Sequence, residues 1–221
     1  MKVRFAVIVF PGSNCDHDAL FALRNSLNVE ADFVWHRESS LKGYDAILIP
    51  GGFSYGDYLR TGAIARFSPI MKSVINQSKK GTPIIGICNG FQILLESGLL
   101  PGALINNKKI KFLSRHVTLE VVSTNSIFSN KMNKGDELKM PIAHREGNYI
   151  ASKEVLDTLK EENRILFKYK NNPNGSALDI GGIVNKSRNV LGMMPHPERA
   201  CDGILGSNDG KLIFESMIGG I

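Results

Sequence analysis

The sequence predicts an α/β fold: a three-layer α/β/α sandwich with a mostly parallel central sheet and a small antiparallel extension. Strand-like and helix-like segments alternate through the first hundred residues. The strand-like segments there are unbroken apolar runs, which are typical of parallel strands buried on both faces. The second half of the chain is richer in strands, and one of them alternates between apolar and polar residues.

The first strand is expected at residues 3–10, where a β-branched and aromatic run ends at a Pro-Gly pair. A helix should follow, with Asp16 or Asp18 as its cap and three leucines at helical spacing. The second strand is expected at 31–35 and the third at 45–49, where a Pro-Gly-Gly turn stops it.

The next helix should turn Ile70, Val74 and Ile75 inward, because these residues recur at helical spacing. A fourth strand is expected at 83–87, and the helix at 90–97 directly after it is ended by a glycine. Parallel strands end at a common edge of their sheet, and ligands bind beyond that edge. Functional residues are therefore expected in the loops that follow these strands.

The second half contributes mostly strands. In the strand at 117–122, Val117, Leu119 and Val121 share one face. Four further strands are expected at 139–143, 165–169, 180–184 and 190–194, the last two paired around a polar turn, with helices at 152–162 and 209–217. No linker or internal repeat interrupts the pattern, so a single domain is expected over residues 1–221.

The bulk composition excludes several classes of protein. The net charge is +6, but lysines and arginines are scattered, so no nucleic-acid partner is expected; an acidic partner surface or a phosphorylated substrate stays open. Apolar runs are too short to span a bilayer, and the N-terminus lacks a signal peptide, so a cytoplasmic protein without a membrane partner is expected. Three widely spaced cysteines form neither a disulfide framework nor a zinc pattern.

Cys88 stands where the strand ending at Ile87 turns into a helix. Such a turn pushes its residue out above the sheet edge, as in the nucleophile elbow of hydrolases. Gly86 and Gly90 leave room where strand and helix approach each other. The helix N-terminus favours a thiolate, and the backbone N–H of Asn89 is placed for an oxyanion. The alternative is a buried, inert cysteine, and this segment alone does not separate the two.

A thiolate nucleophile needs a base, and the best candidate lies in the segment Met-Pro-His-Pro-Glu-Arg at 194–199. Each proline favours an extended conformation in the residue before it, and residues two apart in an extended segment point the same way. His196 and Glu198 should therefore emerge together and complete a Cys–His–Glu triad with Cys88. A His-Pro-Glu on its own is more often a surface turn. His144 is the rival base, and it is not assigned as catalytic.

The segment Pro-Gly-Gly-Phe-Ser-Tyr-Gly-Asp-Tyr at 50–58 follows the third strand and should lie at the same sheet edge as Cys88. Its glycines allow backbone N–H groups to face a ligand, and the amide of Gly52 could complete an oxyanion hole with that of Asn89. A plain flexible turn is the alternative. No Lys-Ser/Thr pair follows the glycines, so this is not a phosphate-binding loop.

Together these segments resemble the class I, triad-type glutamine amidotransferases, a family with a flavodoxin-like fold. The strings that carry the resemblance are Cys-x-Gly-x-Gln at 88–92 and His-Pro-Glu at 196–198. Longer strings at 10–16, 34–36, 50–60, 88–92 and 194–199 are similar to one branch of that family, the small glutaminase subunits of phosphoribosylformylglycinamidine synthases.

The resemblance implies that Cys88 attacks the side-chain amide of L-glutamine and forms a γ-glutamyl thioester. His196 would shuttle protons, Glu198 would orient His196, and water would release glutamate. The residues that the resemblance assigns to the oxyanion and to substrate binding are Gly52, Asn89 and Gln92. It implies no metal and no cofactor in this chain.

The resemblance also implies partners. Ammonia would pass to a separate large subunit that uses ATP and Mg²⁺ to convert formylglycinamide ribonucleotide to its amidine in purine biosynthesis, and a small third subunit would bridge the two. Residues 53–60 and 171–176 are expected on the partner face, and Arg145 stands where the family often has a small residue. Three alternatives stay open: a glutaminase for another synthetase, a non-catalytic sensor with an elbow cysteine, and a cysteine peptidase or esterase.

Overall fold

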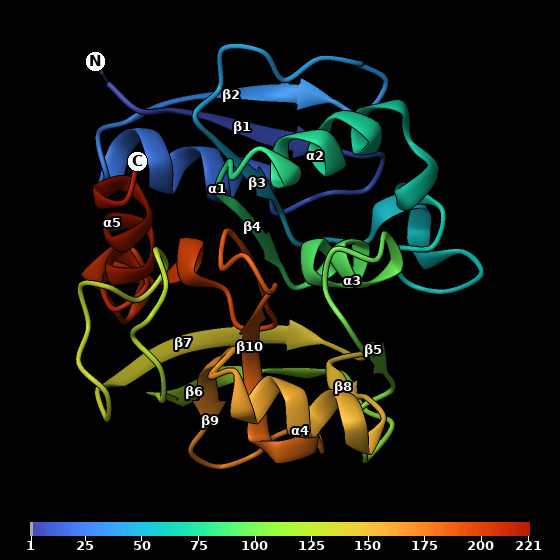
Figure 1. Cartoon of the computed structure of the whole chain (residues 1–221), viewed down its shortest axis with the longest axis vertical. Coiled ribbons are helices and arrows are strands. Elements are labelled where there is room, and N and C mark those ends of the chain that lie inside the picture. Colours follow the sequence, from blue (N-terminus) through green and yellow to red (C-terminus); the bar gives the residue numbers. More distant parts are fainter. Residues whose placement is uncertain (1) are drawn as a thin grey trace.

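The structure, a computed structural model, describes residues 2–221. Within these residues the chain forms one nine-stranded sheet, in the order β2-β1-β3-β4-β11-β10-β9-β6-β7, and a two-stranded sheet of β5 and β8 (Figure 1). The strands are β1 (Arg4–Val9), β2 (Glu30–Trp35), β3 (Ala46–Ile49), β4 (Ile84–Ile87), β5 (Ala103–Ile105), β6 (Leu113–Val121), β7 (Glu137–His144), β8 (Asn148–Ile150), β9 (Ile165–Tyr169), β10 (Ile180–Val184) and β11 (Val190–Met193). The α-helices are α1 (Asp16–Phe21), α2 (Pro69–Lys79), α3 (Asn89–Glu96), α4 (Lys153–Glu161) and α5 (Lys211–Gly219).

The large sheet has a parallel half and an antiparallel half. The strands β2, β1, β3, β4 and β11 pair in parallel. From β11 onward, β10, β9, β6 and β7 pair antiparallel. The predicted antiparallel extension is the continuation of the central sheet by β10, β9, β6 and β7, and the β5–β8 pair is a small separate antiparallel sheet.

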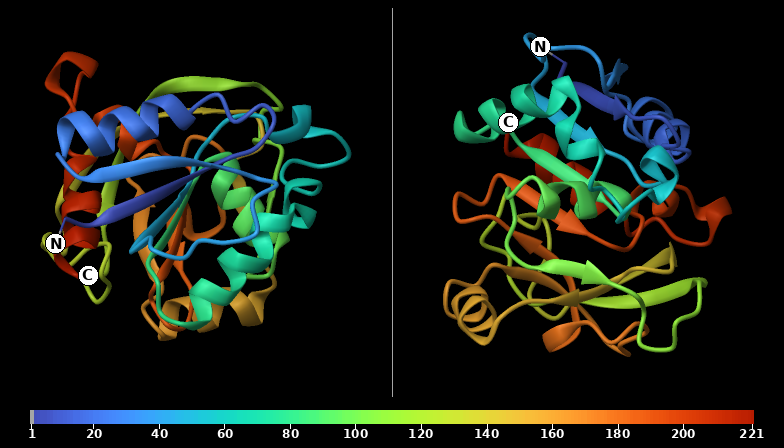
Figure 2. Two further views of the ribbon diagram at one scale, coloured as in Figure 1. Left: turned by 90° about the horizontal axis from the view of Figure 1, so that it is seen from above. Right: turned by 90° about the vertical axis from the view of Figure 1, so that its right-hand side faces the viewer.

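Helices cover both faces of the parallel half, which confirms the three-layer α/β/α architecture. Seen from above, α1 lies on one face of the parallel strands, and α2 and α3 lie on the other (Figure 2). The strands between them are buried along their length: every residue of β3 and β4 is buried. Continuous apolar runs are the sequence pattern that such doubly covered strands require.

The first helix differs from its prediction. Its N-cap is Cys15, which makes no side-chain cap hydrogen bond, and neither aspartate caps it. Both carboxylates have other partners: that of Asp16 accepts from the backbone N–H of His17 at 2.7 Å, and that of Asp18 accepts from Arg199 at 2.8 Å. After Phe21 the helix widens into a π-helical turn over Ala22–Ser26.

The face that α2 buries was predicted in part. Ile70 and Val74 are fully buried, whereas Ile75 is half-buried, and Met71 takes the inward position instead. In the antiparallel half, Val117, Leu119 and Val121 share the buried face of β6 as predicted. Two short strands, β5 and β8, were not predicted, because three residues are too few to show a period in the sequence.

None of the helices within residues 2–221 has the length and apolar character needed to cross a lipid bilayer.

Candidate active site

The carboxyl ends of β3, β4 and β11 meet at one edge of the sheet, and the predicted site residues follow these ends. Gly52 follows β3, Cys88 follows β4, and His196 follows β11. The backbone N–H of Cys88 donates to the carbonyl of Met193 at 2.8 Å, so the turns after β4 and β11 are tied together. The topology therefore gathers three segments that lie far apart in the sequence.

Cys88 occupies a strained turn between β4 and α3. Its backbone lies at φ 52° and ψ −107°, a conformation that costs a non-glycine residue on the order of 1–3 kcal/mol. Two glycines make the turn possible. A Cβ on Gly90 would lie 2.0 Å from the carbonyl oxygen of Ile49, and one on Gly86 would lie 2.5 Å from the Leu94 side chain. The expected close approach of strand and helix is confirmed.

His196 and Glu198 form a buried pair. Nδ1 of His196 lies 2.6 Å from Oε1 of Glu198, and both side chains are 1% exposed. The sequence argument reached this contact by a wrong route, because Pro197–Ala200 is a 3₁₀ turn and not an extended segment. His196 alone is extended (φ −100°, ψ 91°), and the tight turn brings the glutamate back beneath the imidazole.

The imidazole of His196 also faces Cys88. A Cβ on Gly51 would lie 2.7 Å from Cε1 of His196 and 3.3 Å from Cβ of Cys88, so the two side chains meet across this glycine. Burial lowers the pKa of His196, but the negative charges of Glu198 and Cys88 outweigh it and raise that pKa to about 10. The pair is therefore built to hold a proton on the imidazole beside the sulfur.

A second thiol lies close to this pair. Among residues 2–221, donor atoms of Cys15, His196 and Glu198 lie within 4.8 Å of one another. These residue types suit zinc, but His196 Nδ1 and Glu198 Oε1 stand at hydrogen-bond distance, closer than the roughly 3.3 Å between two ligands of a tetrahedral zinc. The absence of a metal from this chain stays a prediction.

Cys15 does not have the properties of a nucleophile. Its sulfur accepts a hydrogen bond from Nη2 of Arg199 at 3.2 Å. Burial, and then the nearby charge of Glu198, raise the pKa of the Cys15 thiol to about 12. A thiol with this pKa is neutral near pH 7, so the nucleophile that the arrangement can support is Cys88.

A cavity of about 250 Å³ opens over Cys88. It is lined by Gly52, Phe53, Asp57, Thr61, Cys88, Gln92, Phe112, Ala143, His144, Arg145 and Glu146. Two carboxylates face it from different loops, and burial, followed by the charge of Glu146, raises the pKa of Asp57 to about 6. The cavity therefore offers acceptors, a guanidinium and a thiol in a space that fits a small amino acid.

Hydrogen bonds fix the cavity wall next to α3. The Asn89 side chain accepts from the backbone N–H of Ser54 at 3.1 Å and donates to Oε1 of Gln92 at 3.1 Å. The amide of Gln92 in turn donates to the carbonyl of Glu146 at 2.7 Å. Both polar atoms of the Gln92 side chain are therefore hydrogen-bonded within the protein, and Gln92 would contact a ligand through van der Waals packing.

Known protein families and solved structures resemble this chain along nearly its whole length. A model of the CobB/CobQ-like glutamine amidotransferase domain matches residues 2–211. The chain belongs to the CobB/CobQ-like glutamine amidotransferases. It is 43% identical to a chain of the structure of PurLQS from Thermotoga maritima, with 99% of both chains covered and a TM-score of 0.92.

More distant glutamine amidotransferases share the fold of this chain. The glutaminase domain of CTPS from Trypanosoma brucei with bound acivicin is 16% identical, with 99% of this chain and 94% of that chain covered and a TM-score of 0.62. A glutamine amidotransferase from Thermotoga maritima is 18% identical, with 98% and 90% covered and a TM-score of 0.58.

The sequence argument for this glutamine amidotransferase missed part of the site. Cys15, Asp57 and Glu146 were not singled out, although Cys15 and Asp57 lie in segments that carry the family resemblance. The usable signal was position: Cys15 and Asp57 follow the carboxyl ends of β1 and β3, where ligands of parallel sheets collect. Glu146 had no such signal, because it follows an antiparallel strand.

Proposed function

We propose that this chain is the glutaminase subunit of phosphoribosylformylglycinamidine synthase. It hydrolyses L-glutamine to glutamate and ammonia, and a separate ATP-dependent large subunit uses the ammonia to convert formylglycinamide ribonucleotide to formylglycinamidine ribonucleotide in purine biosynthesis. The observation that carries the chemistry is a thiol on a strained elbow, above a small-molecule cavity and beside a buried His–Glu pair. The 43% identity with a chain of PurLQS over 99% of both chains supports the choice of complex.

The reaction begins with proton transfer and attack. Cys88 and His196 share one proton, and with that proton on the imidazole the sulfur attacks the side-chain carbonyl carbon of glutamine. The negative charge that develops on the carbonyl oxygen is held by backbone N–H groups of Gly52 and Asn89. Asn89 is the first residue of α3, so its N–H has no acceptor within the helix and is free for this task.

The tetrahedral intermediate then collapses. His196 gives its proton to the departing nitrogen, the C–N bond breaks, and ammonia leaves a γ-glutamyl thioester on Cys88. Water attacks the thioester with His196 as the base, the C–S bond breaks, and glutamate and the thiol are restored. Glu198 keeps the imidazole in the required tautomer through its 2.6 Å contact with Nδ1.

The charged groups of the cavity suit the other end of glutamine. The α-ammonium group pairs with the carboxylates of Asp57 and Glu146, and the α-carboxylate pairs with the guanidinium of Arg145. Oδ1 of Asp57 is buried and has no hydrogen-bond partner in the protein, which leaves it for the ligand. Glu146 is positioned by Thr61, whose hydroxyl donates to it at 2.6 Å.

The partners of the chain belong to the same proposal. The large synthetase subunit carries ATP and Mg²⁺, a small bridging subunit joins it to the glutaminase, and this chain needs no cofactor. The alternative is the same chemistry in service of a different synthetase. Assays of ammonia release and of glutamine-dependent product formation with a panel of candidate large subunits would separate these two. Only the true partner should use the ammonia that this chain releases.

The catalytic assignment is tested with Cys88→Ala in the assembled complex. We expect glutamine hydrolysis and glutamine-dependent amidine formation to be lost, while added ammonium still supports amidine formation, because the synthetase is untouched. Cys201→Ala is the matched control, since this buried thiol lies outside the cavity, and it should leave both activities intact. Glutaminase activity that survives Cys88→Ala would show that another group is the nucleophile.

A further inference from the structure

One side chain of the cavity has no role in the chemistry above, and that side chain is His144, the last residue of β7. The residue is 3% exposed, and its ring packs over Gly147, where a Cβ would lie 2.2 Å from the ring. Gly147 therefore leaves the space that the imidazole fills. The role of a tightly packed histidine in the same cavity as Cys88 therefore needs an explanation.

The hydrogen bonds of Asn107 fix the tautomer of His144. The Asn107 amide nitrogen donates to two carbonyls, those of Lys111 at 2.8 Å and His144 at 2.9 Å. Its Oδ1 accepts from the backbone N–H of Gly147 at 3.1 Å, so the orientation of the amide is settled from both ends. The same Oδ1 lies 3.0 Å from Nδ1 of His144, and the proton of the neutral ring must therefore reside on Nδ1.

Nε2 of His144 is consequently a hydrogen-bond acceptor, and it has no donor. The atom is buried and makes no hydrogen bond with the protein. The Nδ1 side of the ring is turned to Asn107, which is not part of the cavity lining, so the side left for the cavity carries Nε2. Burial, and then the positive charge of His196, lower the pKa of His144 to about 4, so the ring stays neutral near pH 7.

We propose that Nε2 of His144 accepts a hydrogen bond from the carboxamide NH₂ group of the bound glutamine and orients the departing nitrogen. This role rests on the proposed glutaminase function. A carboxamide has two N–H donors, and a buried acceptor without a donor is costly unless the substrate supplies one. As the tetrahedral intermediate forms, an N–H held by His144 turns the nitrogen lone pair toward the proton on His196. The proton still comes from His196, and no covalent bond to His144 forms or breaks.

The proposal predicts a selective defect. L-Glutamic acid γ-methyl ester acylates the same thiol, but its leaving oxygen has no hydrogen to donate. We expect His144→Ala to lower kcat/KM for glutamine by about tenfold or more and to leave kcat/KM for the ester within about threefold. The measurement uses the assembled complex and reports kcat/KM, because this ratio follows the acylation step for both substrates.

Two further variants keep the test decisive. His144→Gln retains a carbonyl acceptor near the same place, and we expect it to recover part of the glutamine activity. His116→Ala removes an exposed histidine outside the cavity, and it should leave kcat/KM unchanged for both glutamine and the ester. Thermal unfolding of each variant shows whether the cavity wall has folded.

The outcomes separate this inference from the proposed function. An equal loss on glutamine and ester in a folded His144→Ala variant would mean that His144 only shapes the cavity, and the inference would be overturned while the glutaminase assignment stands. If His144→Ala leaves kcat/KM unchanged for both substrates, the inference is overturned as well. If the wild-type complex hydrolyses neither substrate, or if Cys88→Ala retains the activity, the proposed function itself fails.

Discussion

The three cysteines share one chain but have different surroundings. Cys15 and Cys201 are buried, and burial followed by the charge of Glu198 raises both of their pKa values to about 12. Cys88 lies at the N-terminus of α3 and lines the cavity. All three side chains are buried, so what distinguishes Cys88 is the cavity that opens over it and not its exposed fraction.

Alkylation should therefore be confined to one thiol. We expect iodoacetamide at neutral pH to modify Cys88 at least about tenfold faster than Cys15 or Cys201, because Cys88 lines an open cavity whereas the pKa of each of the other two thiols is raised to about 12. Mass spectrometry of the digested protein after short reaction times measures the three rates. Excess glutamine should slow the modification of Cys88. Rapid labelling of Cys15 would contradict the assignment of the nucleophile.

The raised pKa of Asp57 leads to a pH prediction. Burial and Glu146 raise that pKa to about 6, so the carboxylate is charged above pH 6 and neutral below it. The α-ammonium of glutamine pairs only with the charged form, and KM for glutamine should therefore rise as pH falls from 7 to 5. His144 stays neutral through this range, since its pKa is lowered to about 4 by burial and by His196.

Asp57→Asn tests this assignment. We expect KM at pH 7 to increase by roughly tenfold, because a hydrogen bond to a charged group is worth about 1.5–3 kcal/mol. KM of the variant should then change little between pH 5 and 7. Steady-state kinetics across that range measure both effects. A variant that keeps the wild-type pH dependence of KM would show that a different group titrates.

At the scale of the element, the sequence predicted the strands better than the caps. Each predicted strand exists within a few residues of its expected bounds. A buried strand needs a continuous apolar run or an alternating pattern, and either one is visible in the sequence. The predicted cap of α1 was wrong because Asp16 pairs with its neighbour His17 and Asp18 pairs with Arg199. The long-range partner of Asp18 leaves no local mark in the sequence.

The candidate site shows the same limit. The elbow at Cys88 was predictable, because the strand, the glycines and the helix are local in sequence. The His196–Glu198 contact was predicted, but the 3₁₀ turn that makes it was not. The orientation of His144 depends on Asn107 and on Gly147, and no local pattern shows that Asn107 forms a hydrogen bond with the ring.

The close packing of β3, the elbow and α3 leads to a stability prediction. Gly90→Ala would place a methyl group 2.0 Å from a β3 carbonyl, and the backbone there cannot move away cheaply. Overpacking of this kind costs about 1–3 kcal/mol or more. We expect a fall in Tm of at least about 3 °C, with a larger loss of glutaminase activity as Cys88 shifts.

Gly219→Ala is the control for Gly90→Ala. Gly219 ends α5 at an exposed position, and a Cβ there would contact only the flexible end of Lys131 at 3.1 Å. We expect its Tm to stay within about 1 °C of the wild type. Scanning calorimetry compares the two variants. Equal stability of both would mean that the elbow is more pliable than its contacts indicate.

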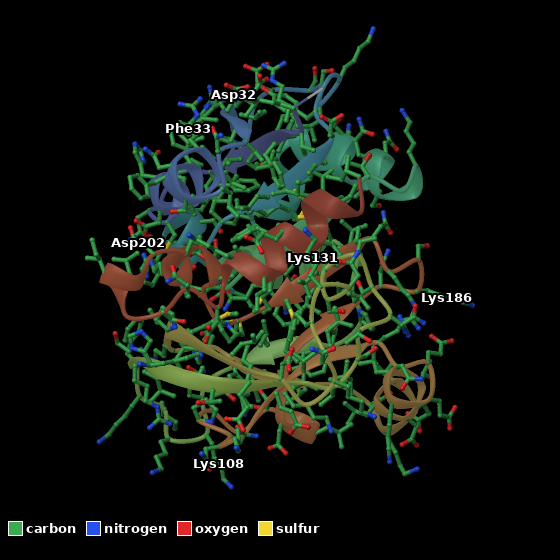
Figure 3. The ribbon with its side chains drawn as sticks, turned by 90° about the vertical axis from the view of Figure 1, so that its left-hand side faces the viewer. Asp32, Phe33, Lys108, Lys131, Lys186 and Asp202 are labelled. Atoms are coloured by element: carbon green, nitrogen blue, oxygen red, sulfur yellow. The ribbon has the colours of Figure 1, made fainter. Side chains whose placement is uncertain are left out.

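At the scale of the whole molecule, charged side chains are spread over the surface, and one loop beside the cavity carries two strongly exposed apolar side chains. Lys108, Lys131 and Lys186 point outward from different parts of the surface (Figure 3). A net charge of +6 arranged in this way does not form the basic stripe of a nucleic-acid-binding face. The apolar side chains beside the cavity are another matter, since Tyr58 and Leu59 are 75% and 88% exposed.

The loop that carries these two side chains also lines the cavity. Phe53, Asp57 and Thr61 belong to it, and three of its non-glycine residues, Tyr55, Asp57 and Leu59, have positive φ. Positive φ in such residues is a strained conformation that is retained where the surroundings require it. A partner that covers Tyr58 and Leu59 would therefore act on the wall of the glutamine cavity as well as on the surface.

The isolated chain should accordingly be a poor glutaminase that the large synthetase subunit activates. We expect Tyr58→Ser with Leu59→Ser to leave the Tm of the isolated chain unchanged, and to raise the concentration of large subunit needed for half-maximal ammonia release by about tenfold or more, since buried aromatic anchors dominate interfaces. Phe33→Ser is the control, because Phe33 is 40% exposed on the edge strand β2 and is not part of the cavity lining. High activity of the chain alone, or equal activation of all three proteins, would show that this loop is not the face on which the synthetase acts.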